Sequence, residues 1–330
     1  MTPQSHFMVV APLAVGCEPG LRTLLESMNI QPGMADRLGA LLPFGLFERL
    51  HFARLVLLDD ELQADMTTYG LPRPHLPTCL AFMGDCDGPA RAFLADLAQR
   101  AGDGLRRVFS HCEGFVATGD LLAWMLAHDR PLAASYVNWV GRSVQQIRQE
   151  SALQRALAGR VPRGALASGA DAQRIRRELL AFVDAEVRAG RLALSPPEAT
   201  PPGWQVAKLV NLLAVPLIGL LALPVLILLL PLLVYQLRSR EKRDPEICPR
   251  PQAAPLQALQ DLEDYDVSNQ YSALGPVKPG LFRRWLVSVL LVQIDYACRH
   301  VFTRGHLARV QTIHFARDRK STRLNSNHSS

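Results

Sequence analysis

The most pronounced feature of the hydrophobicity pattern is an uncharged apolar run at Leu209–Tyr235. Its 27 residues would form a helix about 40 Å long at ~1.5 Å per residue, and the hydrocarbon core of a bilayer is about 30 Å thick. Soluble helices rarely remain apolar on every side over such a length. The run therefore predicts a membrane segment, in which Asn211 and Tyr235 are the main polar groups.

Three prolines interrupt the apolar run: Pro216, Pro224 and Pro231. A proline removes a backbone donor and clashes with the preceding turn. The three residues therefore bend one spanning helix, or they mark a re-entrant hairpin that turns near Gly219–Pro224. The pattern leaves both interpretations open.

The flanks of the run bear on its orientation. Trp204 and Lys208 precede it, and a basic cluster at Arg238–Arg243 follows it. The positive-inside rule places the C-terminal flank in the cytosol, so a single span would put residues 1–205 outside. Against this, the N-terminus does not resemble a signal peptide and the six cysteines show no pairing motif, which favours a cytosolic N-terminal half. A hairpin reconciles these observations.

Residues 1–118 alternate between strand and helix patterns and predict a ferredoxin-like β-α-β-β-α-β unit. Apolar runs that end at turn residues indicate the strands, and a proline at the start favours each helix. The expected strands are His6–Val10, Leu50–Leu58, Thr78–Met83 and one near Phe115, and the expected helices are Leu21–Met28 and Pro89–Gln99.

Two landmarks occur twice and predict an internal duplication. Pro19-Gly20-Leu21 and Pro279-Gly280-Leu281 each open an apolar helical stretch. The motif His-Phe-Ala-Arg follows at His51–Arg54 and again at His314–Arg317, at 31 residues from the glycine in the first copy and 34 in the second. The expected fold is therefore α+β, with two ferredoxin-like units, the second incomplete, that pack through their sheets as an α/β barrel.

The rest of the chain connects these units. Helical patterns at Asp120–His128, Ser143–Leu157 and Asp171–Ala189 indicate an insert, and the stripe Ile175, Leu179, Val183 and Val187 faces either a core or a membrane surface. Trp285–Ile294 is too short to span and reads as a buried or an interfacial helix. The expected boundaries are a helical insert at 119–193, a Pro-rich linker at 194–208, the membrane segment at 209–236, a basic and Pro-rich linker at 237–260, and the start of the second unit at 261–317.

Several of these motifs together resemble an uncharacterised family of bacterial membrane-associated proteins with two ferredoxin-like halves. The resemblance covers most of residues 6–317 and rests on His51–Arg54, Asp87-Gly88-Pro89, Val108-Phe109-Ser110, the stretch from Asp264-Tyr265-Asp266 to Asn269-Gln270, and His314–Arg317. It implies a location at the bacterial inner membrane. The fold is similar in outline to dimeric α/β barrels, which include haem-binding chlorite dismutases and dye-decolourising peroxidases, but this analogy implies no activity.

In that family the second half continues beyond the His-Phe-Ala-Arg motif. Here the apolar pattern stops after Arg317 and gives way to DRKSTRLNSNHSS at Asp318–Ser330. This tract resembles a vector- or adapter-derived tail. We therefore expect 318–330 to be non-native and the second unit to be incomplete.

The repeated motif supplies the candidate ligand- or anion-binding residues His51, Arg54, His314 and Arg317. A neutral imidazole can ligate haem iron, although each histidine can equally hydrogen-bond across the sheet. Each arginine can bind a phosphate or form a structural salt bridge. The aspartates at 59, 60, 85 and 87 read as turns rather than a metal site. His111-Cys112-Glu113 has ligand-type residues but no second cluster at metal-site spacing, and there is no phosphate loop, Gly-x-Ser-x-Gly or His-Glu-x-x-His motif.

Composition adds a preference among partners. The net charge is +6, but the arginines are scattered and no basic patch interleaves with aromatics. With a membrane segment present, we expect the lipid bilayer and anionic lipid headgroups as partners, and no nucleic acid. The sequence predicts a membrane-anchored α/β-barrel-like protein that handles a ligand or lipid at the bilayer surface, with no cofactor. The alternative is a haem-dependent, peroxidase-like enzyme, and the oligomeric state stays open.

Overall fold

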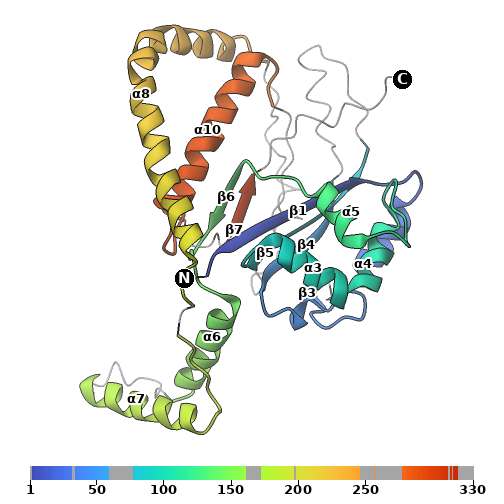
Figure 1. The fold of residues 1–330 in the computed structure, drawn as a ribbon, viewed down its shortest axis with the longest axis vertical. Helices are drawn as coiled ribbons and strands as arrows, with labels where there is room; N and C mark the ends of the chain where they lie inside the picture. The colour runs from blue at the N-terminus through green and yellow to red at the C-terminus, as the bar shows by residue number, and fades with distance from the viewer. Residues whose placement is uncertain are drawn as a thin grey trace.

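A three-stranded antiparallel sheet in the order β1-β5-β4 is the centre of the fold. It consists of β1 (Gln4–Pro12), β4 (Leu50–Leu58) and β5 (Cys79–Asp87), as Figure 1 shows. The structure is a computed structural model. It describes residues 2–31, 34–58, 77–160, 172–196, 198–245, 257, 277–310, 313 and 315–318.

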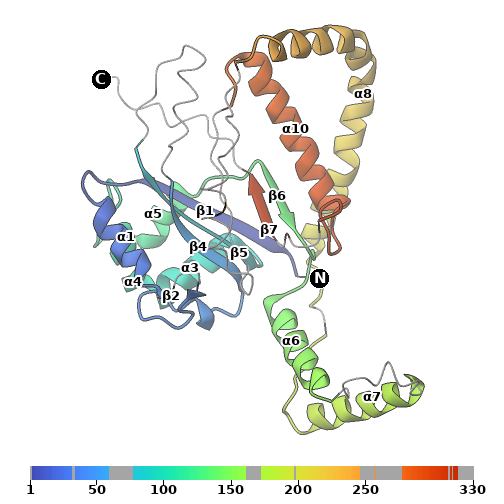
Figure 2. The ribbon, with the colours of Figure 1, turned by 180° about the vertical axis from the view of Figure 1, so that it is seen from behind.

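Helices cover one face of this sheet, and the main hydrophobic core lies between them and the strands (Figures 1 and 2). Val9 of β1, Phe82 of β5 and Leu55 of β4 lie side by side in the register and point toward that core. The ring of Phe82 packs against other core aromatics. The covering helices are α1 (Glu18–Glu26), α3 (Ala90–Arg100), α4 (Gly102–Phe109) and α5 (Leu121–His128), and the smaller elements are β2 (Asn29–Gln31), β3 (Met34–Ala35) and a 3-10 turn at Phe44–Leu46.

The order of the three strands is that of the first three strands of a ferredoxin-like unit, but the expected fourth strand near Phe115 is wrong. Residues 105–109 belong to α4, and the ring of Phe115 packs against Phe109 and Trp124. The chain returns to the free edge of β1 later, where Val9 bridges Asp129 and Arg130 N–H donates to Met8 O at 2.9 Å. The α+β class is confirmed, whereas the expected duplication of ferredoxin-like units, the second incomplete, is not shown among the described residues.

A second small sheet joins a segment that precedes the apolar helix to one that follows it. β6 (Ala134–Val137), which lies inside the expected helical insert, pairs antiparallel with β7 (Phe315–Asp318), and α10 (Leu281–His300) packs on β6. Residues on both sides of the apolar segment therefore form one packed body. Asp318 belongs to this strand, although we expected the tail to begin there; residues 319–330 lie outside the described residues.

The remainder of the insert forms an arm that projects from the sheet (Figure 1). α6 (Val144–Ala158) begins at Ser143, whose hydroxyl accepts from Gln146 N–H while the Gln146 side chain accepts from Ser143 N–H. This reciprocal capping satisfies donors that a helix N-terminus would otherwise expose. α7 (Ala172–Arg188) follows and has no buried residue; in its apolar stripe Ile175, Leu179 and Val183 are partly buried and Val187 is exposed.

The apolar run lies in one continuous helix, α8 (Pro202–Glu241), which extends into both expected linkers. No residue of α8 is buried, and the helix is long and apolar enough to cross a membrane. It leaves the body, turns sharply and continues toward the start of α10 (Figures 1 and 2). Three prolines inside α8 account for a bend of this kind.

Both ends of α8 contact α10. Near its start, Asn211 Oδ1 lies 2.8 Å from His300 Nε2. Beyond its end, Asp244 forms ion pairs with Lys278, at 2.8 Å, and with Arg283. Because α10 also packs on β6, it connects the two ends of the apolar helix to the body.

A hydrogen bond from α10 satisfies a backbone carbonyl that a proline in α8 leaves without a donor. Pro216 has no N–H, so the helical hydrogen bond to the carbonyl four residues earlier, Leu212 O, cannot form. The Tyr296 hydroxyl of α10 donates to that oxygen at 3.2 Å. The freed carbonyl is thus satisfied by the neighbouring helix, as is required in an apolar environment.

This interaction predicts an unusual pair of substitutions. Tyr296→Phe should destabilise the detergent-solubilised protein by about 1 kcal/mol, because Leu212 O loses its donor. In a Pro216→Ala background, the alanine N–H restores the helical bond, and the same substitution should cost far less. Denaturant titration of the four proteins measures the coupling, and equal losses in both backgrounds would contradict the assigned role of Tyr296.

Candidate functional site

The sheet face opposite the main helices carries a row of polar side chains at one end. Strand register places Gln4 opposite Asp87 and His6 opposite Asp85, and the alternation of side chains puts all four on this face. The aspartates were expected in a turn that ended the strand near Met83. β5 instead continues to Asp87, and the turn is confined to Gly88, with φ of 76°, and Pro89.

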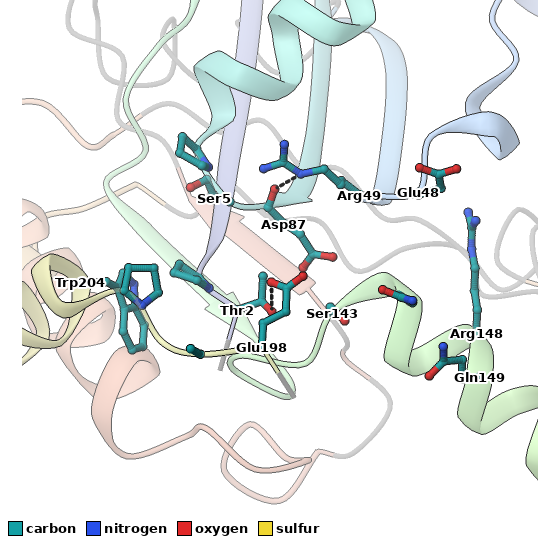
Figure 3. A pocket seen from close by; sticks show the side chains of 16 residues that line it. Thr2, Ser5, Glu48, Arg49, Asp87, Ser143, Arg148, Gln149, Glu198 and Trp204 are labelled. Carbon is teal, nitrogen blue, oxygen red and sulfur yellow. Dashed lines mark hydrogen bonds between the residues drawn. The ribbon is translucent and has the colours of Figure 1, made fainter. Parts of the chain in front are cut away.

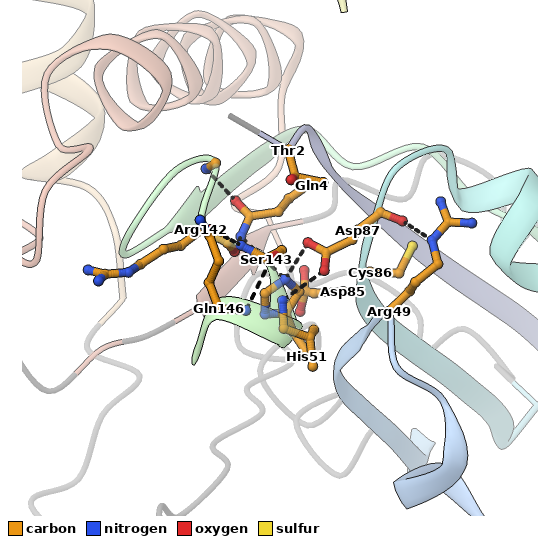
Figure 4. Close-up of polar contacts among 12 residues, drawn as sticks. Thr2, Gln4, Arg49, His51, Asp85, Cys86, Asp87, Arg142, Ser143 and Gln146 are labelled. Carbon is orange, nitrogen blue, oxygen red and sulfur yellow. Dashed lines mark hydrogen bonds and ion pairs between the residues drawn. The ribbon is translucent and has the colours of Figure 1, made fainter. Parts of the chain in front are cut away.

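His51 reaches the same row because β4 contains a bulge. Leu50 pairs with Cys86 and Phe52 with Asp85, so His51 is an extra residue without its own partner in the register. A bulged residue rotates the local side-chain direction. The His51 ring thereby lies beside Asp87 and Gln4 rather than pointing into the core (Figure 4).

A hydrogen-bond network centred on Asp87 connects the sheet to α6. His51 Nε2 lies 2.9 Å from Asp87 Oδ1, and Val144 N–H at the start of α6 donates to Asp87 Oδ2 at 2.8 Å. Arg49 Nε donates to the backbone oxygen of Asp87 at 3.0 Å. The side chains of His51 and Asp87 are only 2% and 6% exposed. An ionised carboxylate at such a position needs these donors, because burial without them is costly.

Gln4 completes the connection from β1. Its side-chain nitrogen donates to Arg142 O at 2.8 Å, and its side-chain oxygen accepts from Gly141 N–H at 3.1 Å. The same nitrogen lies 3.3 Å from His51 Nε2. The turn before α6 is therefore held by two strands of the sheet, through Gln4 and Asp87 (Figure 4).

A second histidine–aspartate pair lies further along the row. His6 Nδ1 contacts Asp85 Oδ1, and the Asp85 side chain is fully buried. Sequence reasoning missed Gln4, His6 and this pairing. The strand alternation of β1 contained the signal, but the partners on β5 depended on extending that strand through Asp85 and Asp87.

The other candidate residues divide between the described and undescribed parts of the chain. Arg54 lies on β4 opposite Met83, half-buried on the polar face, and burial lowers the pKa of its guanidinium. Arg317 lies in β7, where its backbone pairs with Ser135, but its side chain is outside the described residues, as is His314. Anion binding at Arg54 and Arg317 stays a prediction.

The two copies of the repeated motif nevertheless meet. The ring of Phe315 lies 5.5 Å from the His51 ring and 4.9 Å from the Phe52 ring, between centroids. Phe52 and Phe315 occupy the same position in their motifs, and both lie on strands. The structure thus brings together the aromatic positions of the two motifs.

The geometry limits the chemistry of this face. His51 Nε2 is bonded to Asp87 and its ring is buried, so it does not fit a haem ligand as it stands. In the part of the chain that the structure describes, no group of three His, Cys, Asp or Glu side chains is placed to hold a metal ion. Burial raises the pKa of Cys86 and Cys112 to about 12, which keeps both thiols protonated.

An open pocket lies on the far side of Asp87 and reaches the start of α8 (Figure 3). Its volume is about 930 Å³. The ends of β1, β4 and β5 meet the beginnings of α3, α6 and α8 around it. Its charged and aromatic lining comprises Arg49, Arg148, Glu48, Glu198, Asp87 and Trp204.

Comparison with known proteins identifies no relative. A scan against protein-family models and searches of curated proteins and of solved structures gave no match.

The Asp87 network predicts a large and local stability effect. Asp87→Ala leaves the Val144 N–H and the buried His51 ring without their acceptor and should destabilise the protein by about 2–4 kcal/mol. Limited proteolysis should show earlier cleavage at α6, because its attachment is lost. Asp96→Ala, which removes an exposed pair with Arg100 at 3.2 Å, is the matched control and should cost less than about 0.5 kcal/mol. Equal melting temperatures for the two variants would contradict this assignment.

Proposed function

We propose that this protein is a membrane-anchored, α/β-barrel-like protein that handles a lipid or another ligand at the bilayer surface. The observation that carries the proposal is the exposed apolar helix α8, whose two ends are both attached to α10 on the body. A water-soluble protein rarely exposes an apolar patch of this extent. The pocket at the start of α8, whose lining includes five charged side chains, supplies a place for a ligand.

The membrane segment is best described as a re-entrant hairpin. β6 precedes α8, β7 follows it, and the two strands pair in one sheet. A single span would separate these strands by the bilayer, so one molecule cannot both pair them and cross once. This argument favours the hairpin over the single span and leaves the soluble parts together on one side, which we take to be the cytosolic side of a bacterial inner membrane.

Length is compatible with this arrangement. α8 has 40 residues and α10 has 20, which correspond to about 60 Å and about 30 Å of helix. If the bend is at Pro224, the proline nearest the middle of α8, two arms of roughly 30 Å stand on a base of roughly 30 Å. The apex then lies roughly 25 Å from α10, which is less than the ~30 Å hydrocarbon core.

The end of α8 suits contact with anionic headgroups. Arg238, Arg240, Lys242 and Arg243 follow the apolar run, and Arg283 and Arg284 begin α10 beside them. Asp244 neutralises part of this charge, since its hydrogen bonds to Lys278 and Arg283 lower the pKa of its carboxyl group. The remaining basic side chains can bind phosphates near the membrane surface.

The duplicated fold also belongs to this proposal. The β1-β5-β4 order and the meeting of Phe52 with Phe315 support two related units that pack through their strands. They also support the resemblance to the two-halved bacterial membrane family. His51 does not support the haem-dependent alternative, because its Nε2 is hydrogen-bonded to Asp87.

Topology can be tested with single exposed cysteines. Val15→Cys and His306→Cys place one thiol on each side of α8 in a background carrying Cys17→Ser and Cys248→Ser; the other four native cysteines are buried. In intact cells, both introduced thiols should resist a membrane-impermeant maleimide, and both should react after permeabilisation. Reaction of only one of them in intact cells would establish a single span. Reaction of both would retain the hairpin but reverse its side.

The anchor can be tested with charges on the exposed apolar surface. Leu220→Arg with Leu221→Arg should move the protein from the membrane fraction to the soluble fraction, because each arginine costs about 2.5–3.5 kcal/mol at the centre of a membrane helix. The matched control is Leu38→Arg with Val116→Arg, which adds the same charge to exposed apolar positions of the body. If the two double variants fractionate alike, α8 is not the anchor.

A further inference from the structure

We infer that the pocket at the start of α8 binds a zwitterionic phospholipid headgroup, with the phosphate at Arg49 and the ammonium at Glu198 and Trp204. This inference rests on the proposed membrane anchoring and names the ligand class of the pocket. Four observations carry it: the position of the pocket, its two arginines, its carboxylates and its aromatic wall.

The first observation is the position of the pocket. Trp204 lines the pocket and lies in the first turn of α8, and Lys208 stacks over its ring at 5.1 Å one turn later. Tryptophan and lysine at the end of an apolar helix mark the level of the lipid headgroups. The pocket therefore opens where α8 enters the bilayer, within reach of the headgroups of that leaflet.

Arg49 forms the phosphate subsite, and Arg148 adds a second positive charge on another wall of the pocket (Figure 3). Arg49 uses its Nε to hold the backbone oxygen of Asp87, which fixes its guanidinium at the pocket wall. Gly88 permits this position, because a Cβ at Gly88 would lie 2.1 Å from the guanidinium. Arg148 extends from α6, and both side chains are exposed (Figure 3). The fixed Arg49 guanidinium suits a phosphodiester, which accepts charge-assisted hydrogen bonds.

The N-termini of two helices, α3 and α8, add backbone N–H donors that also favour an anion. α3 begins at Pro89, and α8 begins at Pro201, and neither helix has a side-chain cap. Both residues line the pocket. Uncapped helix N-termini favour a negative group, and they reinforce the arginines without being needed to define the subsite.

The carboxylates argue against a purely anionic ligand. Asp87 is already bound by His51 and Val144 N–H, but Glu48 and Glu198 also line the pocket and balance the two arginines. The Thr2 hydroxyl donates to Glu198 Oε2 at 3.0 Å, which holds this carboxylate on the Trp204 side of the pocket (Figure 3). A carboxylate beside an indole suits an ammonium group. A headgroup with both charges satisfies the whole lining.

The test uses the full chain in detergent and short-chain phospholipids below their micellar concentration. Dihexanoyl phosphatidylethanolamine should bind saturably at one site by calorimetry, and dihexanoyl phosphatidylglycerol should bind at least tenfold more weakly. Arg49→Gln with Arg148→Gln should weaken binding of the ethanolamine lipid by tenfold or more. Arg107→Gln, which removes an exposed charge elsewhere on the body, should leave it unchanged.

Further arms distinguish the subsites and the source of the ligand. Glu198→Gln should remove the preference for ethanolamine over glycerol while the variant still binds phosphate esters through the arginines. If glycerophosphoethanolamine without acyl chains binds as tightly as the lipid, the ligand is a soluble ester. Equal binding of both lipids, or binding that the arginine variant does not weaken, would overturn the inference.

Membrane anchoring is measured separately by flotation with phosphatidylglycerol vesicles. Flotation without headgroup selectivity would leave the anchor and remove the pocket assignment. Failure to float with any vesicle would remove the proposed membrane function, whereas the calorimetric titration would still decide whether the pocket accepts a zwitterion.

Discussion

The pairing of β6 with β7 is the constraint on which the rest of the structure depends. These strands lie on opposite sides of the apolar helix in the chain, yet their backbone hydrogen bonds require them to be about 5 Å apart. The chain between them must therefore leave the body and return to it. α10 makes this return possible, since it contacts β6 and both ends of α8. A tertiary contact thus limits the topologies open to the proposed membrane segment.

Local patterns predicted most of the elements, because the information that determines them is local. β1, β4, α3, α5, α6 and α7 all lie close to their expected ranges, whereas α10 is twice as long as the expected Trp285–Ile294; Ser143 begins α6 with a capping pair that the sequence contains. β6 was missed because four residues between two helices carry little periodicity, and its partner is far away in the chain. The fourth strand near Phe115 failed for a related reason. Its aromatic ring packs on α4 and α5, and tertiary packing outweighed an apparent strand pattern.

The candidate site was only partly predictable. The repetition of His-Phe-Ala-Arg identified His51, and the structure brings Phe52 and Phe315 together. Asp85 and Asp87 were read as turn residues, because Asp-Gly-Pro normally ends a strand. The buried donors around them reverse that expectation. His6, His51 and Val144 N–H stabilise the carboxylates, so β5 can extend through two acidic residues. No local sequence pattern predicts such donors, because they come from three separate segments of the chain.

The energetic objection to a hairpin is that a bend in hydrocarbon leaves carbonyl groups unpaired. Two features of α8 lower this cost. The helix is continuous from Pro202 to Glu241, so the bend does not require an unwound loop. At Pro216, where one helical bond must be lost, Tyr296 donates to the freed Leu212 oxygen. The polar side chain of Asn211, one residue earlier, is likewise paired with His300. α10 thus supplies polar partners to Leu212 O and Asn211, and in the proposed hairpin it is a part of the membrane element rather than a connection beyond it.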